Sequence, residues 1–186
     1  MARENKSRYA LLGILSFHPM SGYDLKKQIE QTTNHFWHED FAQIYPILKQ
    51  LEAEGLTTST VEKQEGRPER HIYALTEKGW GALRNWIAKP VSSQVRRNEL
   101  LLKLFFADHV PVAVSIEHVQ QFREFQLVLQ EAFQRLKDSI TQQHPVSKQS
   151  TYWLLTVNYG ACVSQALINW CDDTLAQLGQ LDDTTT

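Results

Sequence analysis

The sequence has few cysteines and no long apolar stretch. Its 186 residues include two cysteines, Cys162 and Cys171, nine positions apart. That spacing places them on opposite faces of one helix, which excludes a local disulfide. No run of eighteen or more apolar residues occurs, and the N-terminal apolar segment is too brief and amphipathic for a signal peptide. We therefore expect a cytoplasmic protein with reduced thiols and no membrane partner.

Motifs of enzymes and metal sites are also lacking. The sequence contains no HExxH, no CxxC, no Gly-rich phosphate loop and no nucleophile motif. Seven histidines are present, but the pairs His35/His38 and His109/His118 have no accompanying Cys or carboxylate at ligand spacing. We therefore expect no enzymatic activity, no cofactor and no metal.

An overall excess of positive charge, usual in nucleic-acid-binding proteins, is absent as well. The formal net charge is -2, with 12 Lys+Arg against 11 Asp+Glu in residues 1–90 and 7 against 10 in residues 91–186. Binding to phosphates depends on local charge at the contact surface, so this balance permits DNA binding without indicating it. A protein–protein adaptor is the alternative that the near-neutral charge favours.

The sequence does contain many apolar residues. In two segments near the N-terminus they recur at the spacing of a helix. Residues 8–17 predict one helix. Ser21 and Asp24 form a capping-box pattern before a second helix, whose apolar face we assign to Tyr23, Leu25 and Ile29. With five Trp, eight Phe and six Tyr in the whole chain, we expect a substantial core and an oligomer.

Residues 41–75 predict a helix followed directly by a hairpin. Asp40 can cap this third helix, with Gln43 in the reciprocal position, and Gly55 ends it. Runs 57–61 and 71–75 read as strands around a charged Gly/Pro turn. Thr76 then caps a fourth helix up to about residue 88, with an apolar face of Trp80, Leu83, Trp86 and Ile87. This order is typical of a winged helix-turn-helix domain, which we assign to residues 1–90.

After a Ser/Gln/Arg linker near residues 91–97, the rest of the chain is predicted to consist of long helices, with a break at Pro111. The segment 98–108 is apolar nearly all round, so we expect it to be buried. Helical periods continue over about 113–140 and 148–178. The last helix has a second apolar face, made of Leu155, Tyr159, Cys162, Ala166 and Trp170. That face is most simply covered by the same helix of a second subunit.

Several motifs together resemble the PadR-type transcriptional regulators. They are YALLGIL followed after five residues by SGYDL, then IYPILKQLEAEGL, HIYALTEKG and the helical tail. The resemblance covers essentially the whole chain and implies a mostly α fold, an α+β winged helix with a C-terminal helical domain. It also implies a homodimer that binds an inverted-repeat operator in double-stranded DNA. Most members of this family are repressors released by a small hydrophobic or aromatic compound.

Candidate DNA contacts lie on the third helix and at the hairpin. Gln43 can read adenine, a Tyr45 hydroxyl can donate to phosphate and Lys49 can neutralise one. Alternatively, Gln43 caps the helix and Tyr45 packs. At the hairpin we select the cations Lys63, Arg67 and Arg70, which alternate with glutamates, so a solvated, self-compensating turn is the competing interpretation.

Aromatic residues are the candidate effector contacts. Phe36, Trp37, Trp153 and Trp170 could stack on an aromatic effector such as a phenolic acid, although such residues are more often core. Residues 91–186 would then be a dimerisation and effector-sensing domain. A multidrug sensor for flat cations is the alternative within the same family, and activation in place of repression stays open.

Overall fold

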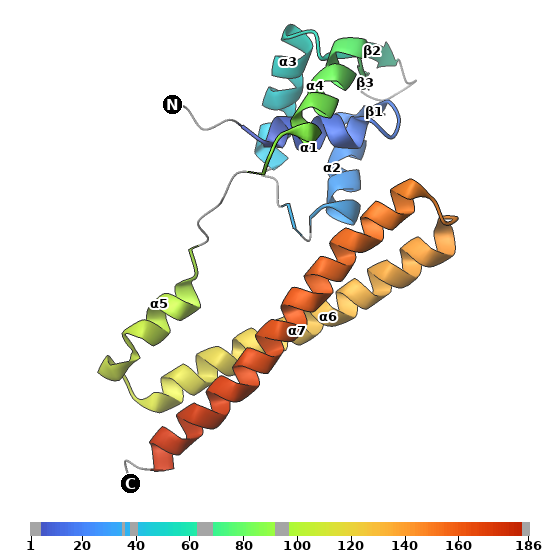
Figure 1. The fold of residues 1–186 in the computed structure, drawn as a ribbon. Helices are drawn as coiled ribbons and strands as arrows, with labels where there is room; N and C mark the ends of the chain where they lie inside the picture. The colour runs from blue at the N-terminus through green and yellow to red at the C-terminus, as the bar shows by residue number, and fades with distance from the viewer. Residues whose placement is uncertain (1–4, 35, 38–40, 63–68, 92–96, 184–186) are drawn as a thin grey trace. The chain divides into compact units, whose positions relative to one another are not determined.

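The chain divides into two compact units. The computed structural model describes residues 5–34, 36–37, 41–62, 69–91 and 97–183 (Figure 1). The first unit comprises residues 1–93 and the second residues 94–186, so the division lies three residues after the predicted boundary at residue 90. In the described ranges, no helix combines the length and apolarity needed to cross a membrane.

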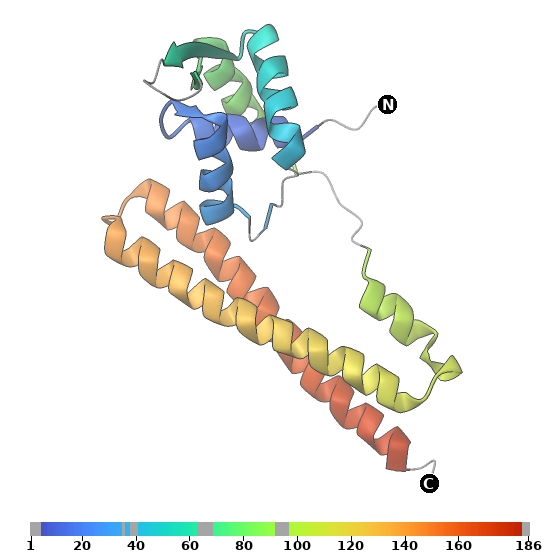
Figure 2. The same ribbon diagram turned by 180° about the vertical axis from the view of Figure 1, so that it is seen from behind.

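The first unit is a small helical domain with a three-stranded antiparallel sheet (Figures 1 and 2). Its elements are α1 (Ser7–Leu15), β1 (Met20–Ser21), α2 (Gly22–Thr32), the 3-10 turn η1 (Phe41–Gln43), α3 (Ile44–Ala53), β2 (Thr57–Glu62), β3 (Arg70–Leu75) and α4 (Glu77–Ala88). The strand order is β1-β3-β2. The ladder between β2 and β3 runs from Thr57↔Leu75 to Glu62↔Arg70, and Ser21 pairs with Ile72 at the short β1 edge. The predicted helix-then-hairpin order is confirmed.

Apolar faces of the helices meet in one core. The completely buried aliphatic side chains are Leu11, Leu12, Leu25, Ile29, Leu48 and Leu51. Burying each such side chain contributes about 1.5–3 kcal/mol relative to exposure. At the edge of this core, Tyr9 of α1 stacks on Trp86 of α4, with ring centroids 4.7 Å apart.

Two predicted core residues are exposed instead. Tyr23 is 69% exposed because it lies two positions before Leu25, and a rotation of about 200° puts it on the opposite face of α2. Ile87 is 66% exposed, since the face of α4 that packs on the core runs through Gly79, Leu83 and Trp86. Both predictions were wrong.

Local signals set most of the helix ends. The Ser21 hydroxyl accepts the Asp24 N–H at 3.2 Å and the Asp24 carboxylate accepts the Ser21 N–H, so the predicted capping box is present. Gly55 has φ 69°, as a helix-terminating glycine should. The Thr76 hydroxyl caps α4 by accepting the Gly79 N–H. The start of α3 differs from the prediction: Gln43 occupies the N-cap without a side-chain cap bond, and Asp40 lies outside the described residues.

The second unit is built on a long helical hairpin. It contains α5 (Glu99–Phe105), the 3-10 turn η2 (Ala107–His109), α6 (Val112–Gln143) and α7 (Lys148–Asp183). In both views α6 and α7 lie side by side (Figures 1 and 2). Phe133, Ile140 and Val157 form the buried centre of their contact.

Two contacts fix how α6 and α7 fit together. The Phe133 ring lies so close to Gly160 that a Cβ there would be 2.5 Å from it. One turn further along α7, the buried Ser164 hydroxyl donates to the Gln126 backbone carbonyl at 2.8 Å, and it lies 3.1 Å from the side-chain oxygen of Gln126. A bulky residue and a buried polar pair therefore both specify this alignment.

The prediction that segment 98–108 is buried is wrong for the single protomer. No residue of α5 is buried, and Phe105 is 79% exposed. The physical reason is that α6 and α7 already pack on each other, while α5 stands off from their hairpin (Figure 1). On α7, Leu155, Tyr159, Cys162 and Ala166 are also exposed, whereas Trp170 is half-buried beside Phe122.

Candidate nucleic-acid interface

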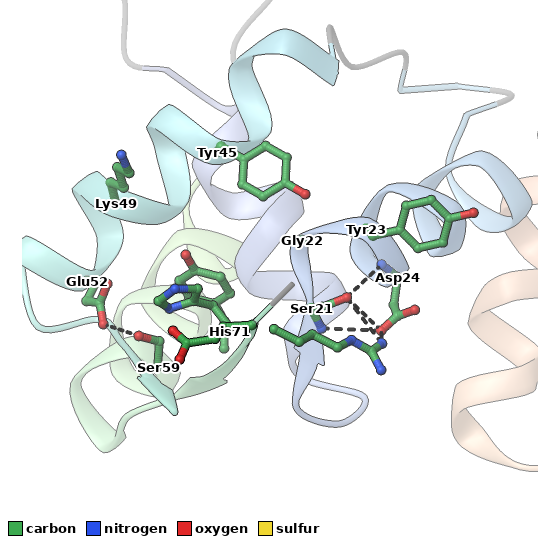
Figure 3. A pocket seen from close by; sticks show the side chains of 12 residues that line it. Ser21, Gly22, Tyr23, Asp24, Tyr45, Lys49, Glu52, Ser59 and His71 are labelled. Atoms are coloured by element: carbon green, nitrogen blue, oxygen red, sulfur yellow. Dashed lines mark hydrogen bonds and ion pairs between the residues drawn. The ribbon is translucent and has the colours of Figure 1, made fainter. Parts of the chain in front are cut away.

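A shallow groove of about 860 Å³ lies between the helices and the sheet of the first unit (Figure 3). Residues of β1, α2, α3, β2 and β3, with Glu69 just before β3, line it: Ser21, Gly22, Tyr23, Asp24, Tyr45, Lys49, Glu52, Ser59, Glu69, Arg70, His71 and Tyr73. Of the six DNA-contact residues predicted from sequence, Tyr45, Lys49 and Arg70 line this groove. Gln43 is exposed on the turn before α3, and Lys63 and Arg67 lie outside the described residues.

Helix α3 presents a polar face because its apolar residues are committed to the core. Ile44, Ile47, Leu48 and Leu51 are buried. Tyr45 and Lys49, four positions apart, are exposed on the other side and both line the groove, and the Tyr45 ring points toward the start of α2 (Figure 3). A phenol and an ammonium group on one helix face can donate to phosphates or base edges.

The Tyr45 ring is positioned by Gly22 at the start of α2. A Cβ at residue 22 would lie 2.6 Å from Cε1 of Tyr45, closer than any side chain there could be. Tyr45 is nevertheless 55% exposed. One side of the ring therefore rests on the α2 backbone, and the other side faces solvent. Tyr45 thus packs in part, and its exposed side remains available for contact with DNA.

Arg70 extends toward α2. Its guanidinium forms an ion pair with the Asp24 carboxylate and donates to the Ser21 hydroxyl at 3.3 Å. Burial raises the pKa of Asp24, but hydrogen bonds from Ser21 and the charge of Arg70 outweigh it, so the pKa lies below its ordinary value of 3.8. The carboxylate therefore stays charged at neutral pH and offsets Arg70.

Nine of the twelve groove residues were not predicted as contacts from the sequence, among them His71 and Tyr23. His71 is exposed, and its ring lies 6.5 Å from that of Tyr73, because positions two apart on β3 share one face. That alternation along β3 was the available signal. Tyr23 was assigned to the core, although its spacing from Leu25 indicated the opposite face.

Acidic side chains in the groove are partly engaged by neighbours. Ser59 of β2 donates to the Glu52 carboxylate at 2.6 Å, and Arg70 engages Asp24. Lys49 of α3 and His71 of β3 also line the groove (Figure 3). A near-neutral domain thus presents hydrogen-bond donors at one surface.

Two of the four predicted effector residues, Trp153 and Trp170, lie far apart on α7. Trp153 and Trp170 are 17 positions apart on α7, about 25 Å along the axis. Trp153 lies edge-on to His144 and Trp170 edge-on to Phe122. Phe36 and Trp37 belong to the other unit, just after α2. In the described ranges, no three His, Cys, Asp or Glu side chains form a metal-binding group, and His35 and His38 lie outside those ranges.

Family models match both units of the chain. Residues 11–85, from α1 to α4, match the model described as the transcriptional regulator PadR-like family. Residues 11–85 form a PadR-like family domain. Residues 96–179 match a second model, described as virulence activator alpha C-term. The PadR-like match thus contains the whole groove, and the second match spans α5, α6 and most of α7.

Named relatives agree with this assignment. The negative transcriptional regulator PadR of Bacillus subtilis is 35% identical over 101 residues, which is 53% of this chain and about half (55%) of that relative's length. The crystal structure of B. subtilis PadR with operator DNA has a TM-score of 0.82 at 23% identity, and the one with p-coumaric acid 0.77 at 22%. Each covers 94% of this chain and 99% of the PadR chain. The Vibrio cholerae virulence activator AphA gives 0.76 at 25%, covering 94% and 98%. The expected PadR winged-helix fold is confirmed.

Proposed function

We propose that this PadR-like regulator is a cytoplasmic, homodimeric repressor that binds an inverted-repeat operator. The observation that carries the proposal is the exposed pair Tyr45 and Lys49 on α3. This pair shares a groove with His71 of β3, in the β2–β3 hairpin that forms the wing of the winged helix. A helix of this kind fits the major groove, where donors can reach base edges, while a wing reaches flanking phosphates. B. subtilis PadR, a negative regulator by name, has been crystallised with operator DNA.

Contacts are assigned by position. Gln43 and Tyr45, near the start of α3, would face bases or phosphates, and Lys49 a phosphate. At the wing tip we assign phosphate contacts to Lys63 and Arg67, which lie outside the described residues. Two such domains, related by a two-fold axis, would bind the two halves of a palindrome.

Exposed apolar side chains in the second unit support the homodimer. Leu101, Leu102 and Phe105 of α5 are half or more exposed, as are Leu155 and Tyr159 of α7. Monomeric soluble proteins rarely expose apolar patches of this kind without a partner. A second copy would bury both sets and supply the two-fold symmetry that a palindromic operator requires.

Selection of genomic fragments tests DNA binding directly. Purified protein is incubated with sheared genomic DNA, and bound fragments are sequenced. We expect enrichment of one family of inverted repeats, including one near the gene for the regulator or its neighbour. If no inverted repeat is enriched, the repressor proposal fails and the protein–protein adaptor gains support.

We further propose that a phenolic acid lowers operator affinity. The support is the solved complex of B. subtilis PadR with p-coumaric acid. A ligand shifts the equilibrium when it binds the DNA-incompetent arrangement more tightly than the competent one. Candidate stacking residues are Phe36, Trp37, Trp153 and Trp170, so binding should change tryptophan fluorescence.

Titration with p-coumaric and ferulic acids tests this effector class. Fluorescence and operator release are followed together, with a flat cationic dye as the comparison ligand. Release by the acids supports the phenolic proposal, and release by the dye alone supports the multidrug alternative. An absence of response to the acids up to millimolar concentration would refute the phenolic class.

A further inference from the structure

Four consecutive residues, Ser21–Asp24, contact both α3, the proposed recognition helix, and the wing. Gly22 supplies the surface on which the Tyr45 ring of α3 rests. Ser21 pairs with Ile72 of β3 through the backbone, and Asp24 forms an ion pair with Arg70. These residues also start α2 through their capping box. One short segment therefore contacts both elements that the proposed function places on DNA.

Arg70 strengthens the short contact between β3 of the wing and the segment that starts α2. Strand β1 has two residues, and its ladder with β3 ends at Ser21↔Ile72. Arg70 lies two residues further toward the wing tip, where it is also the last partner of β2, opposite Glu62. Its ion pair with Asp24 thus extends the contact between wing and α2 beyond the backbone ladder.

We propose that Arg70 is a positioning residue for operator binding, which acts through Asp24 to hold the wing at a fixed place relative to α2 and the Tyr45 face of α3. The inference rests on the proposed function. A guanidinium that already engages a carboxylate and the Ser21 hydroxyl has its charge offset and its donors directed at the protein. Phosphate contacts then fall to Lys49 and to the wing tip.

A double-mutant cycle on operator affinity separates this role from a direct phosphate contact. The variants are Arg70→Ala, Asp24→Asn and the double variant. Asparagine keeps a side-chain acceptor for the cap but removes the charge. A positioning role predicts that each single change weakens binding on the order of 3- to 30-fold per dimer, with the double variant no weaker than the weaker single variant.

A direct phosphate contact predicts a different pattern. Removing the Asp24 charge would then release Arg70 toward DNA and remove a repulsive anion, so Asp24→Asn would bind as tightly as wild type or more tightly. The salt dependence of operator affinity is an independent test of whether Arg70 contacts a phosphate. If Arg70 touched one phosphate in each half-site, Arg70→Ala would lower the slope of log K against log salt by about 2, whereas a positioning role leaves the slope unchanged.

Hydrogen exchange in the free protein gives a reading that needs no operator. Loss of the Asp24–Arg70 pair should speed exchange of β1 and β3 amides, while Arg84→Ala, an exposed cation on α4, serves as the charge-matched control and should change neither exchange nor affinity. Unchanged exchange, additive losses or tight binding by Asp24→Asn would overturn the positioning role and leave the repressor proposal intact. Failure of the wild type to select any inverted repeat would instead refute the repressor proposal, and with it an operator role for Arg70.

Discussion

At two positions in the first unit, a neighbouring group lies so close to the backbone that only glycine fits without a shift. Gly22 and Gly79 both lie where a side chain would collide with a neighbour, but the neighbours differ. At residue 22 the obstacle is the exposed Tyr45 ring, which can swing aside. At residue 79 it is the backbone carbonyl of Leu56, at 2.0 Å from a built Cβ, which cannot move without moving the wing.

Gly79→Ala should therefore destabilise the protein, by about 1–3 kcal/mol or more, because the start of α4 must separate from Leu56. Gly81, also in α4, has no atom within 4 Å of a built Cβ. Gly81→Ala should instead stabilise by about 0.5–1 kcal/mol through helix propensity. Chemical denaturation of both variants measures the difference, and equal stability of the two would contradict the close approach at residue 79.

Lys49 is the residue on which the electrostatic part of the proposed interface depends most directly. Lys49→Ala should weaken operator binding and lower the salt slope by about 0.9 for each lost phosphate contact, or about 2 for a dimer. Lys137→Ala on α6 removes the same exposed charge from the second unit and is the control. Gel shifts over a range of salt concentrations give both quantities, and an unchanged slope for Lys49→Ala would remove this residue from the contacts.

At the scale of elements, the boundaries of the first unit follow from signals that are local in sequence. The Ser21/Asp24 capping pattern, Gly55 and Thr76 could each be read in advance, because a cap or a positive φ depends on a few neighbouring residues. The direction of the Arg70 side chain could not. Asp24 lies 46 positions away, so the ion pair exists only after α2 and the wing have been brought together.

Another ion pair of the first unit joins α1 to the end of α3, because the Arg8 guanidinium engages the Glu54 carboxylate. The hydrogen bond from Arg8 lowers the pKa of Glu54 below its ordinary 4.5. A folded-state pKa below the unfolded one stabilises the fold above the unfolded value, and this contribution disappears as pH falls through the folded value.

Glu54→Gln should therefore lower the melting temperature at neutral pH, and the difference from wild type should shrink as the pH falls through the lowered folded-state pKa of Glu54, because the wild-type carboxyl then becomes protonated. Thermal melts of wild type and variant from pH 7 to pH 3 measure this convergence. Glu124→Gln, an exposed position on α6, is the control. A difference between wild type and Glu54→Gln that stays constant with pH would show that the charge of Glu54 does not contribute.

At the scale of the whole molecule, apolar pattern and burial diverge most in the second unit. Periodicity predicted the long helices α6 and α7, since each has a continuous stripe that the other covers. It also predicted that α5 is buried, and no α5 residue is buried in the single chain. The sequence shows that a helix face is apolar, but it does not show whether the residues that bury this face belong to the same chain or to a second one.

Tyr159→Asp should convert a homodimer to monomers, because it places a charge in the exposed stripe of α7 opposite the α6 contact. Thr141→Asp, at an exposed position on α6, should leave the dimer unchanged. Light scattering after size-exclusion chromatography measures the mass. A Tyr159→Asp protein that stays dimeric would show that the stripe is not the interface.

Cysteine labelling gives an internal check on the same interface. Cys162 lies in the stripe and is exposed in the single chain, whereas Cys171 is buried and burial raises its pKa. Cys162 should be protected from a maleimide in the dimer and react in the Tyr159→Asp monomer, while Cys171 should react slowly in both.

The alignment of α6 with α7 limits how a signal could travel through the second unit. A slip of one turn would carry Gly160 away from the Phe133 ring and set a larger side chain against it, and would leave the buried Ser164 and Gln126 groups without each other. These penalties oppose sliding of one helix along the other. An effector that acts on this hairpin must therefore tilt or rotate it as one rigid lever, so its two ends should move together in any comparison of ligand-bound and DNA-bound states.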